Sequence, residues 1–254
     1  MTHKLKVWFP SCLLAFTLLA FSSNAHAEGD VWLRADSGKL TLGLVNEEGT
    51  EFTPGVRIYS TILTPVTLPF SPFDLSSGEP GFQSPPGSLP ANQPVNLTVE
   101  SLTVWDGAAL VPVSGVDFTF DLSSGFESSS TGGLHDHAPF GLIDLTSGVS
   151  PVNDGVYVAA FRASMEGVEA SEVGYLVMLH DTLITNEDYA EEVSALLETY
   201  ESEGTPPVFS GKDFSYFAAV QDHVASSIPE PTGLVPAVVA AIAFASACRR
   251  RRLS

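Results

Sequence analysis

Apolar and polar residues alternate along many short stretches of this 254-residue chain, and this alternation constrains the fold more than any other feature. Residues 95–105 are the clearest case, because Val95, Leu97 and Val99 share one face of an extended strand. Similar runs, separated by Gly, Pro, Ser and Asp, occur at residues 31–35, 39–45, 56–66, 110–113, 116–122, 156–163 and 173–179. We therefore predict a mainly β fold, built as a single β-sandwich or jelly-roll-like domain.

One amphipathic helix is expected within this β pattern. Thr185 and Asp188 fit a capping box, and apolar residues follow at helical spacing until Gly204 ends the helix. The apolar stripe is suited to packing on the sheet, with partner binding as the alternative interpretation. Residues 70–94 and 125–133 are rich in Gly, Pro or Ser, and we expect loops without regular structure there.

Residues 1–27 have the three parts of a signal peptide. Two lysines give a basic start, and an apolar run follows. Residues 25–27, Ala-His-Ala, then form an A-x-A-type cleavage site, which predicts a mature start at Glu28. The apolar run is short for a permanent membrane span, so we expect export rather than anchoring at this end.

The C-terminal end combines a Pro-Glu-Pro triplet, an apolar stretch and a basic cluster. The apolar stretch, residues 233–248, is slightly shorter than the ~20 residues that span a bilayer. By the positive-inside rule, the arginines stay on the cytoplasmic side and the preceding chain lies outside, in agreement with a signal peptide. The triplet and the cluster consist of Pro229, Glu230, Pro231, Arg249, Arg250, Arg251 and Arg252.

In order, spacing and terminal position, residues 229–254 resemble the PEP-CTERM sorting tail, with Pro236 inside the span as a departure. The resemblance implies an exosortase-type membrane protease as a partner, with extracellular polysaccharide as a second candidate. It also implies an inner-membrane anchor, formed by a C-terminal transmembrane helix, before processing to the cell surface or extracellular matrix. A plain C-terminal anchor is the alternative. The predicted organisation is a signal peptide (1–27), an exported β-rich domain (28–228, the body) and the sorting tail (229–254).

The composition of the body excludes several classes of function. It carries 29 acidic and five basic residues, a formal charge of −24, which disfavours contact with nucleic acid or anionic membrane. Both cysteines, Cys12 and Cys248, lie in the terminal segments, so the body has no disulfide, cysteine nucleophile or cysteine-based zinc site. The sequence also lacks the G-x-S-x-G, P-loop and H-E-x-x-H fingerprints of common enzyme classes.

Histidines are the residues of the body that point most directly to chemistry. His135 and His137 form an H-x-H pair, and in an extended segment both imidazoles share one face and can ligate one metal ion. Zinc or copper suits such a site, which needs further ligands. The candidates are Asp136, which an extended strand points away, and His180 and His223, each beside an aspartate. Exposed loop histidines without a metal are the alternative.

A second resemblance rests on loose motifs within residues 30–180. In order they are Trp105-Asp106-Gly107, the H-x-H pair, Gly-Val-Tyr-Val-Ala-Ala-Phe at 155–161, and Ala-Ser-Glu at 170–172 followed by Tyr-Leu-Val-Met at 175–178. They resemble an uncharacterised group of PEP-CTERM proteins linked to zinc-responsive regulation, with a histidine-rich segment at this place. The resemblance implies a metal-handling role for the H-x-H pair, although this chain has two histidines there instead of a dense run.

Three functional hypotheses follow. The first is a non-catalytic surface or extracellular-matrix protein, with no enzyme activity. The second is a zinc- or copper-binding surface protein that uses the H-x-H pair. The third is a secreted polysaccharide-active hydrolase, which needs paired carboxylates. Nothing in the sequence pairs the candidates for that role, which are Asp74, Asp117, Asp121 and Asp144.

Overall fold

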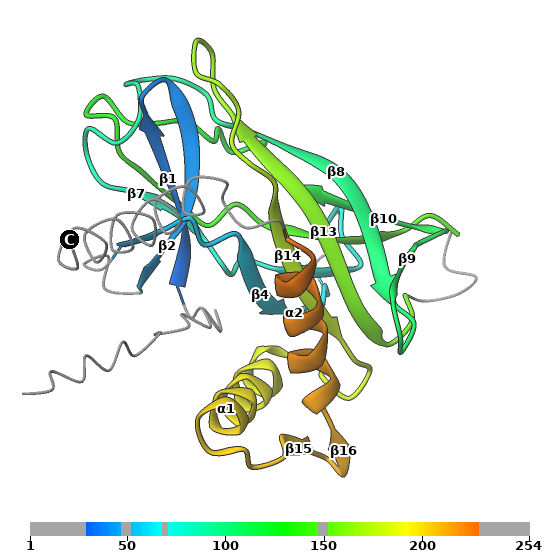
Figure 1. The fold of residues 1–254 in the computed structure, drawn as a ribbon. Coiled ribbons are helices and arrows are strands. Elements are labelled where there is room, and N and C mark those ends of the chain that lie inside the picture. Colours follow the sequence, from blue (N-terminus) through cyan, green and yellow to red (C-terminus); the bar gives the residue numbers. More distant parts are fainter. Residues whose placement is uncertain (1–28, 47–51, 68–70, 147–151, 229–254) are drawn as a thin grey trace, which may run out of the picture.

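The computed structural model describes residues 29–46, 52–67, 71–146 and 152–228 (Figure 1). The predicted signal peptide and sorting tail lie outside the described residues. Within the described ranges, no helix is long and apolar enough to cross a membrane. The prediction of a mainly β fold is confirmed, since these ranges contain 16 strands and two helices.

Two sheets contain most strands of the first half of the chain. One has the order β11-β7-β1-β2-β3, made of β1 (Gly29–Asp36), β2 (Lys39–Asn46), β3 (Phe52–Pro54), β7 (Phe82–Ser84) and β11 (Leu134–Asp136). The other has the order β10-β12-β6-β5, made of β5 (Thr64–Pro65), β6 (Leu75–Ser77), β10 (Val116–Phe120) and β12 (Phe140–Asp144).

A third sheet carries the longest strands and meets both helices (Figure 1). Its order is β4-β14-β13-β8-β9, made of β4 (Ile58–Ile62), β8 (Asn96–Trp105), β9 (Leu110–Pro112), β13 (Gly155–Ser164) and β14 (Gly174–His180). After it come α1 (Glu187–Glu203), a small hairpin of β15 (Val208–Phe209) and β16 (Lys212–Asp213), and α2 (Ser215–Ser227). The predicted Asp106-Gly107 turn joins β8 to β9 as an antiparallel hairpin.

The central strands β13 and β14 of the third sheet are buried on both faces, which explains their continuous apolar runs. In β13, Tyr157, Ala159 and Phe161 face a cluster shared with the other two sheets, whereas Val156 and Val158 face a cluster shared with α1 and α2. The sheet therefore forms a central layer between the helices and the remaining strands. Because of this layering, α1 packs on the third sheet and lies beside the candidate site.

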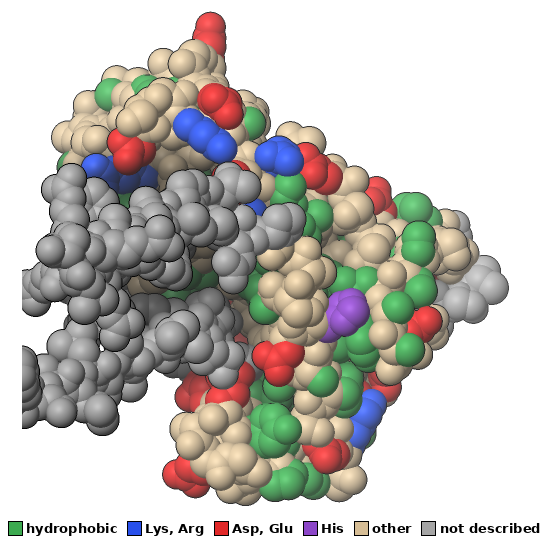
Figure 2. All heavy atoms as spheres, viewed as in Figure 1, with side chains coloured by type: hydrophobic (Ala, Val, Ile, Leu, Met, Phe, Trp, Pro, Cys, Tyr) green, Lys and Arg blue, Asp and Glu red, His purple; other side chains and the backbone are tan. Residues whose placement is uncertain are grey.

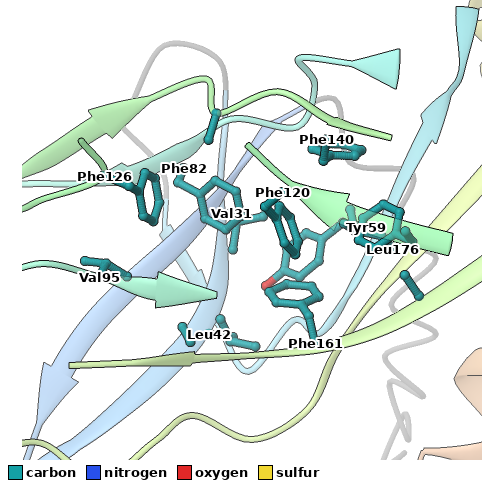
Figure 3. Close-up of a cluster of buried hydrophobic side chains, with 14 of the residues drawn as sticks. Val31, Leu42, Tyr59, Phe82, Val95, Phe120, Phe126, Phe140, Phe161 and Leu176 are labelled. Carbon is teal, nitrogen blue, oxygen red and sulfur yellow. The ribbon is translucent and has the colours of Figure 1, made fainter. Parts of the chain in front are cut away.

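Aromatic rings fill the cluster between the sheets (Figure 3). Phe82 contacts Phe120, Phe126 and Phe161 edge-on, with ring centroids 5.2–6.4 Å apart. Phe82 belongs to β7, so the prediction that residues 70–94 lack regular structure is wrong for β6 and β7. Each of these strands has three residues, too few for an alternation to stand out from the surrounding Pro, Gly and Ser.

The predicted helix is confirmed as α1, with a correction at its start. Its N-cap is Asn186 rather than Thr185, and the Asn186 side chain accepts a hydrogen bond from the Tyr189 N–H. Gly204 ends the helix in the left-handed conformation (φ 74°), as predicted. The expectation of a single helix is wrong, because α2 is a second one. The sequence pattern does not predict α2, because this helix lacks a side-chain N-cap hydrogen bond and buries only a short apolar stripe.

The contact between α1 and α2 makes a pH-dependent contribution to stability. Burial raises the pKa of the Glu201 carboxyl from 4.5 to about 7, and the Asp222 carboxylate adds to the rise. The folded state therefore binds a proton that the unfolded state releases, and stability falls as the pH rises from about 4.5 to 7. We expect Glu201→Gln to become progressively more stable than wild type as the pH is raised from about 5 to 8, measured by urea unfolding. The exposed Glu203→Gln is the control, and an equal response in both variants would contradict this prediction.

Candidate metal centre

Strand register sets up the candidate site in the first sheet. Asp136 of β11 pairs with Phe82 of β7, and Phe82 pairs with Val31 of β1. Strand β11 runs antiparallel to β7, and β1 runs parallel to it. The next three neighbours across these strands are therefore His137, Gly81 and Asp30. Asp30 and His137 therefore approach each other across a residue that has no side chain.

The two imidazoles of the H-x-H pair converge, as the same-face argument predicts. His135 Nε2 lies 3.2 Å from His137 Nε2. One ligand atom from each of Asp30, His135 and His137 lies within 4.8 Å of the other two. The structure thus brings together the two predicted histidines and adds a carboxylate that the sequence analysis missed. We call Asp30, His135 and His137 the ligand cluster.

The separation of the imidazoles fits a shared metal ion. Two nitrogens bound to tetrahedral zinc at about 2.0–2.1 Å lie about 3.3 Å apart. The separation of 3.2 Å between the two Nε2 atoms is close to this value. Two histidines and a carboxylate form a ligand set that zinc uses in sites with an open fourth position.

Glu79 positions one of the two imidazoles. Its Oε1 lies 2.9 Å from His137 Nδ1. A carboxylate that accepts the Nδ1 proton fixes the tautomer and leaves Nε2 free for a metal. The Gly81 N–H connects the two carboxylates of the site, since it donates to Asp30 Oδ1 (2.9 Å) and to Glu79 Oε2 (3.1 Å). Glu79 is therefore a positioning residue for His137.

Asp30 is a buried carboxylate, only 9% exposed. Within the described residues it accepts a hydrogen bond from the Gly81 N–H and takes part in no ion pair with Lys or Arg. Burying a charged carboxylate is costly unless donors or a cation compensate for the lost hydration. A metal ion held by the ligand cluster would supply that cation.

The other predicted ligands lie away from the cluster. Asp136 follows His135 in β11 and points to the opposite face of the sheet, as the alternation predicts. His180 ends β14 in the third sheet, where burial lowers its pKa and its Nδ1 has no hydrogen-bond partner within the described residues. His223 of α2 contacts Trp105, with ring centroids 4.9 Å apart. None of the three joins the ligand cluster.

The ligand cluster opens into a cleft of about 750 Å³ between the first sheet and α1. Its three residues and Glu79 line one wall, and α1 forms the opposite wall. The aspartates considered for hydrolysis do not line this cleft. Three of them accept backbone hydrogen bonds instead: Asp74 from the Asp144 N–H (2.6 Å), 70 residues along the chain, Asp117 from the Phe118 N–H (2.8 Å) and Asp121 from the Ser123 N–H (3.0 Å).

A substitution at Gly81 tests the site without replacing any of the ligand residues. A Cβ at this position would lie 2.8 Å from Asp30 Oδ1 and 2.8 Å from His137 Nδ1, so Gly81→Ala must push the two side chains apart. We expect a loss of zinc affinity of at least about tenfold, the scale of outer-shell changes at metal sites. Gly78→Ala is the matched control, because Gly78 also lines the cleft and its Cβ would meet nothing within 4 Å. Equal affinities of the two variants, measured by isothermal titration calorimetry, would contradict the described geometry.

Comparison of the chain with protein-family models, with curated proteins and with solved structures gives no match. The residues of the candidate metal centre are therefore the evidence from which a function can be inferred. Those residues are two convergent imidazoles, a buried carboxylate beside them, and a second carboxylate that orients one imidazole.

Proposed function

We propose that the body is a non-catalytic metal-binding domain that holds one zinc or copper ion at Asp30, His135 and His137. The observation that carries the proposal is the convergence of these three side chains from two segments that lie far apart in the chain. The fit of the imidazole separation to a shared ion, the orienting role of Glu79 and the burial of Asp30 support it. Imidazole suits both metals, so the ligand set leaves the choice between them to experiment.

Delivery of this domain to the cell surface or extracellular matrix is part of the same proposal. It is supported by the signal-peptide pattern at one end of the sequence and the PEP-CTERM-like tail at the other, read by an exosortase-type protease. The resemblance to a group linked to zinc-responsive regulation agrees with a metal-handling role. We also interpret the body as a β-sandwich, because strands of all three sheets contribute to one hydrophobic cluster.

Metal analysis tests the proposed function directly. The full-length chain is incubated with zinc or with copper, freed of unbound ions by gel filtration, and analysed by mass spectrometry of the elements. We expect one ion per chain for at least one of the two metals. A content below about 0.1 ion per chain, typical of contamination, would leave a surface protein without a metal as the better hypothesis.

A further inference from the structure

The cleft beside the ligand cluster is much larger than a metal ion requires. Its volume of about 750 Å³ lies within the range of small-molecule sites, about 300–1,000 Å³. All three members of the ligand cluster line a single wall. A zinc ion with three protein ligands keeps a fourth position for water or an external group, and that position would face the cleft. The cleft therefore has room for an organic ligand that reaches the ion.

Many of the residues that line the cleft carry hydrogen-bonding groups. Four polar residues of α1 at helical spacing line it: Glu187, Glu191, Ser194 and Glu198. Hydroxyls of five further residues also line it, from Ser60, Thr61, Thr64, Ser76 and Ser77. Some of them are held in place by each other, as in the hydrogen bond from Thr61 Oγ1 to Ser77 Oγ (2.9 Å). Carboxylates only accept hydrogen bonds, so these walls suit a ligand that is rich in donors.

The charges of the residues that line the cleft limit the class of ligand further. No Lys or Arg is among the described residues that line the cleft, and acidic side chains are also widespread over the face of the protein shown in Figure 2. An anionic ligand would be repelled by the glutamates of α1. A group that binds the open position of the ion needs a lone pair, which an ammonium group lacks. The hydroxyls of an uncharged ligand offer lone pairs to the ion and also donate hydrogen bonds to the carboxylates.

On these grounds we propose that the cleft binds a neutral sugar, with one hydroxyl directed to the open position of the metal ion and others donated to Glu187 and Glu191. This inference rests on the proposed metal site and extends it from ion binding to ligand recognition. Apolar side chains also line the cleft, among them Ile62, Leu197 and the aromatic Phe217, and the non-polar face of a sugar ring can pack against such a surface.

Calorimetry of the full-length chain tests the inference in two steps. Zinc is titrated first, and neutral trisaccharides of glucose, galactose and mannose are then titrated into the zinc-loaded protein. The glucosamine trimer and the galacturonic acid trimer serve as cationic and anionic comparisons. We expect at least one neutral trisaccharide to bind at least about tenfold more tightly than either charged trimer.

Two matched double variants of α1 separate recognition from general charge effects. Glu187→Gln with Glu191→Gln removes two carboxylates that line the cleft, and Asp188→Asn with Glu192→Gln removes two exposed carboxylates of the same helix that do not. We expect the first pair alone to weaken sugar binding, by at least about tenfold.

The outcomes distinguish this inference from the proposed function. Equal losses in both double variants, tighter binding of a charged trimer, or no binding of any neutral trisaccharide to the zinc-loaded chain would overturn the sugar site. Each of these results would leave the metal site intact. Failure of both zinc and copper to bind, each titrated in the same way, would overturn both proposals.

Discussion

Replacing both histidines of the H-x-H pair is expected to abolish specific metal binding. The variant His135→Ala with His137→Ala removes two of the three members of the ligand cluster and leaves Asp30 as a single carboxylate. Outer-shell changes at metal sites typically cost 10–100-fold in affinity, so the loss of two direct ligands should exceed about 100-fold. Competition with a chelator of known zinc affinity measures this loss, and the same titration with copper follows it for the second metal.

The control for this variant is His223→Ala. His223 of α2 contacts Trp105 of β8 and lies outside the ligand cluster, so its replacement removes an imidazole without touching the site. We expect zinc affinity to change by less than about twofold. If both variants lose affinity to the same degree, zinc binds to dispersed surface histidines and the ligand cluster is not the site. Far-UV circular dichroism verifies that each variant is folded.

The largest effect on stability is expected for Phe161→Ala. Phe161 is fully buried in β13, and its ring lies 5.6 Å from Phe120 and 6.2 Å from Tyr59, between centroids. Removing a buried phenylalanine ring costs about 3–5 kcal/mol through lost burial and the cavity left behind. That loss is a large share of the 5–15 kcal/mol that stabilises a typical domain. Urea unfolding followed by tryptophan fluorescence measures it.

Leu145→Ala provides the comparison for Phe161→Ala. Leu145 is 60% exposed, so its truncation should change the free energy of unfolding by less than about 0.5 kcal/mol. A cost below about 1.5 kcal/mol for Phe161→Ala would mean that the aromatic cluster in Figure 3 is not the main core of the domain.

The long strands of this fold can be predicted from their sequence pattern, and the short ones cannot. In β8 and β13 the ten-residue length makes the alternation visible, because each residue adds to the same two-residue period. In β6 and β7 three residues give no measurable period, although Phe82 occupies the centre of the aromatic cluster. The helix α2 escapes prediction for a related reason, since its apolar stripe of Phe217, Val220 and Val224 is short.

The candidate site, too, can be predicted from the sequence only in part. The shared face of His135 and His137 can be predicted from local sequence, because the two-residue period of an extended strand is a local property of the backbone. The position of Asp30 and Gly81 beside them depends on the tertiary structure. The pairing of β1 with β7 and of β7 with β11 joins segments far apart in the chain, and such pairing depends on long-range hydrogen bonds and burial that no local pattern encodes.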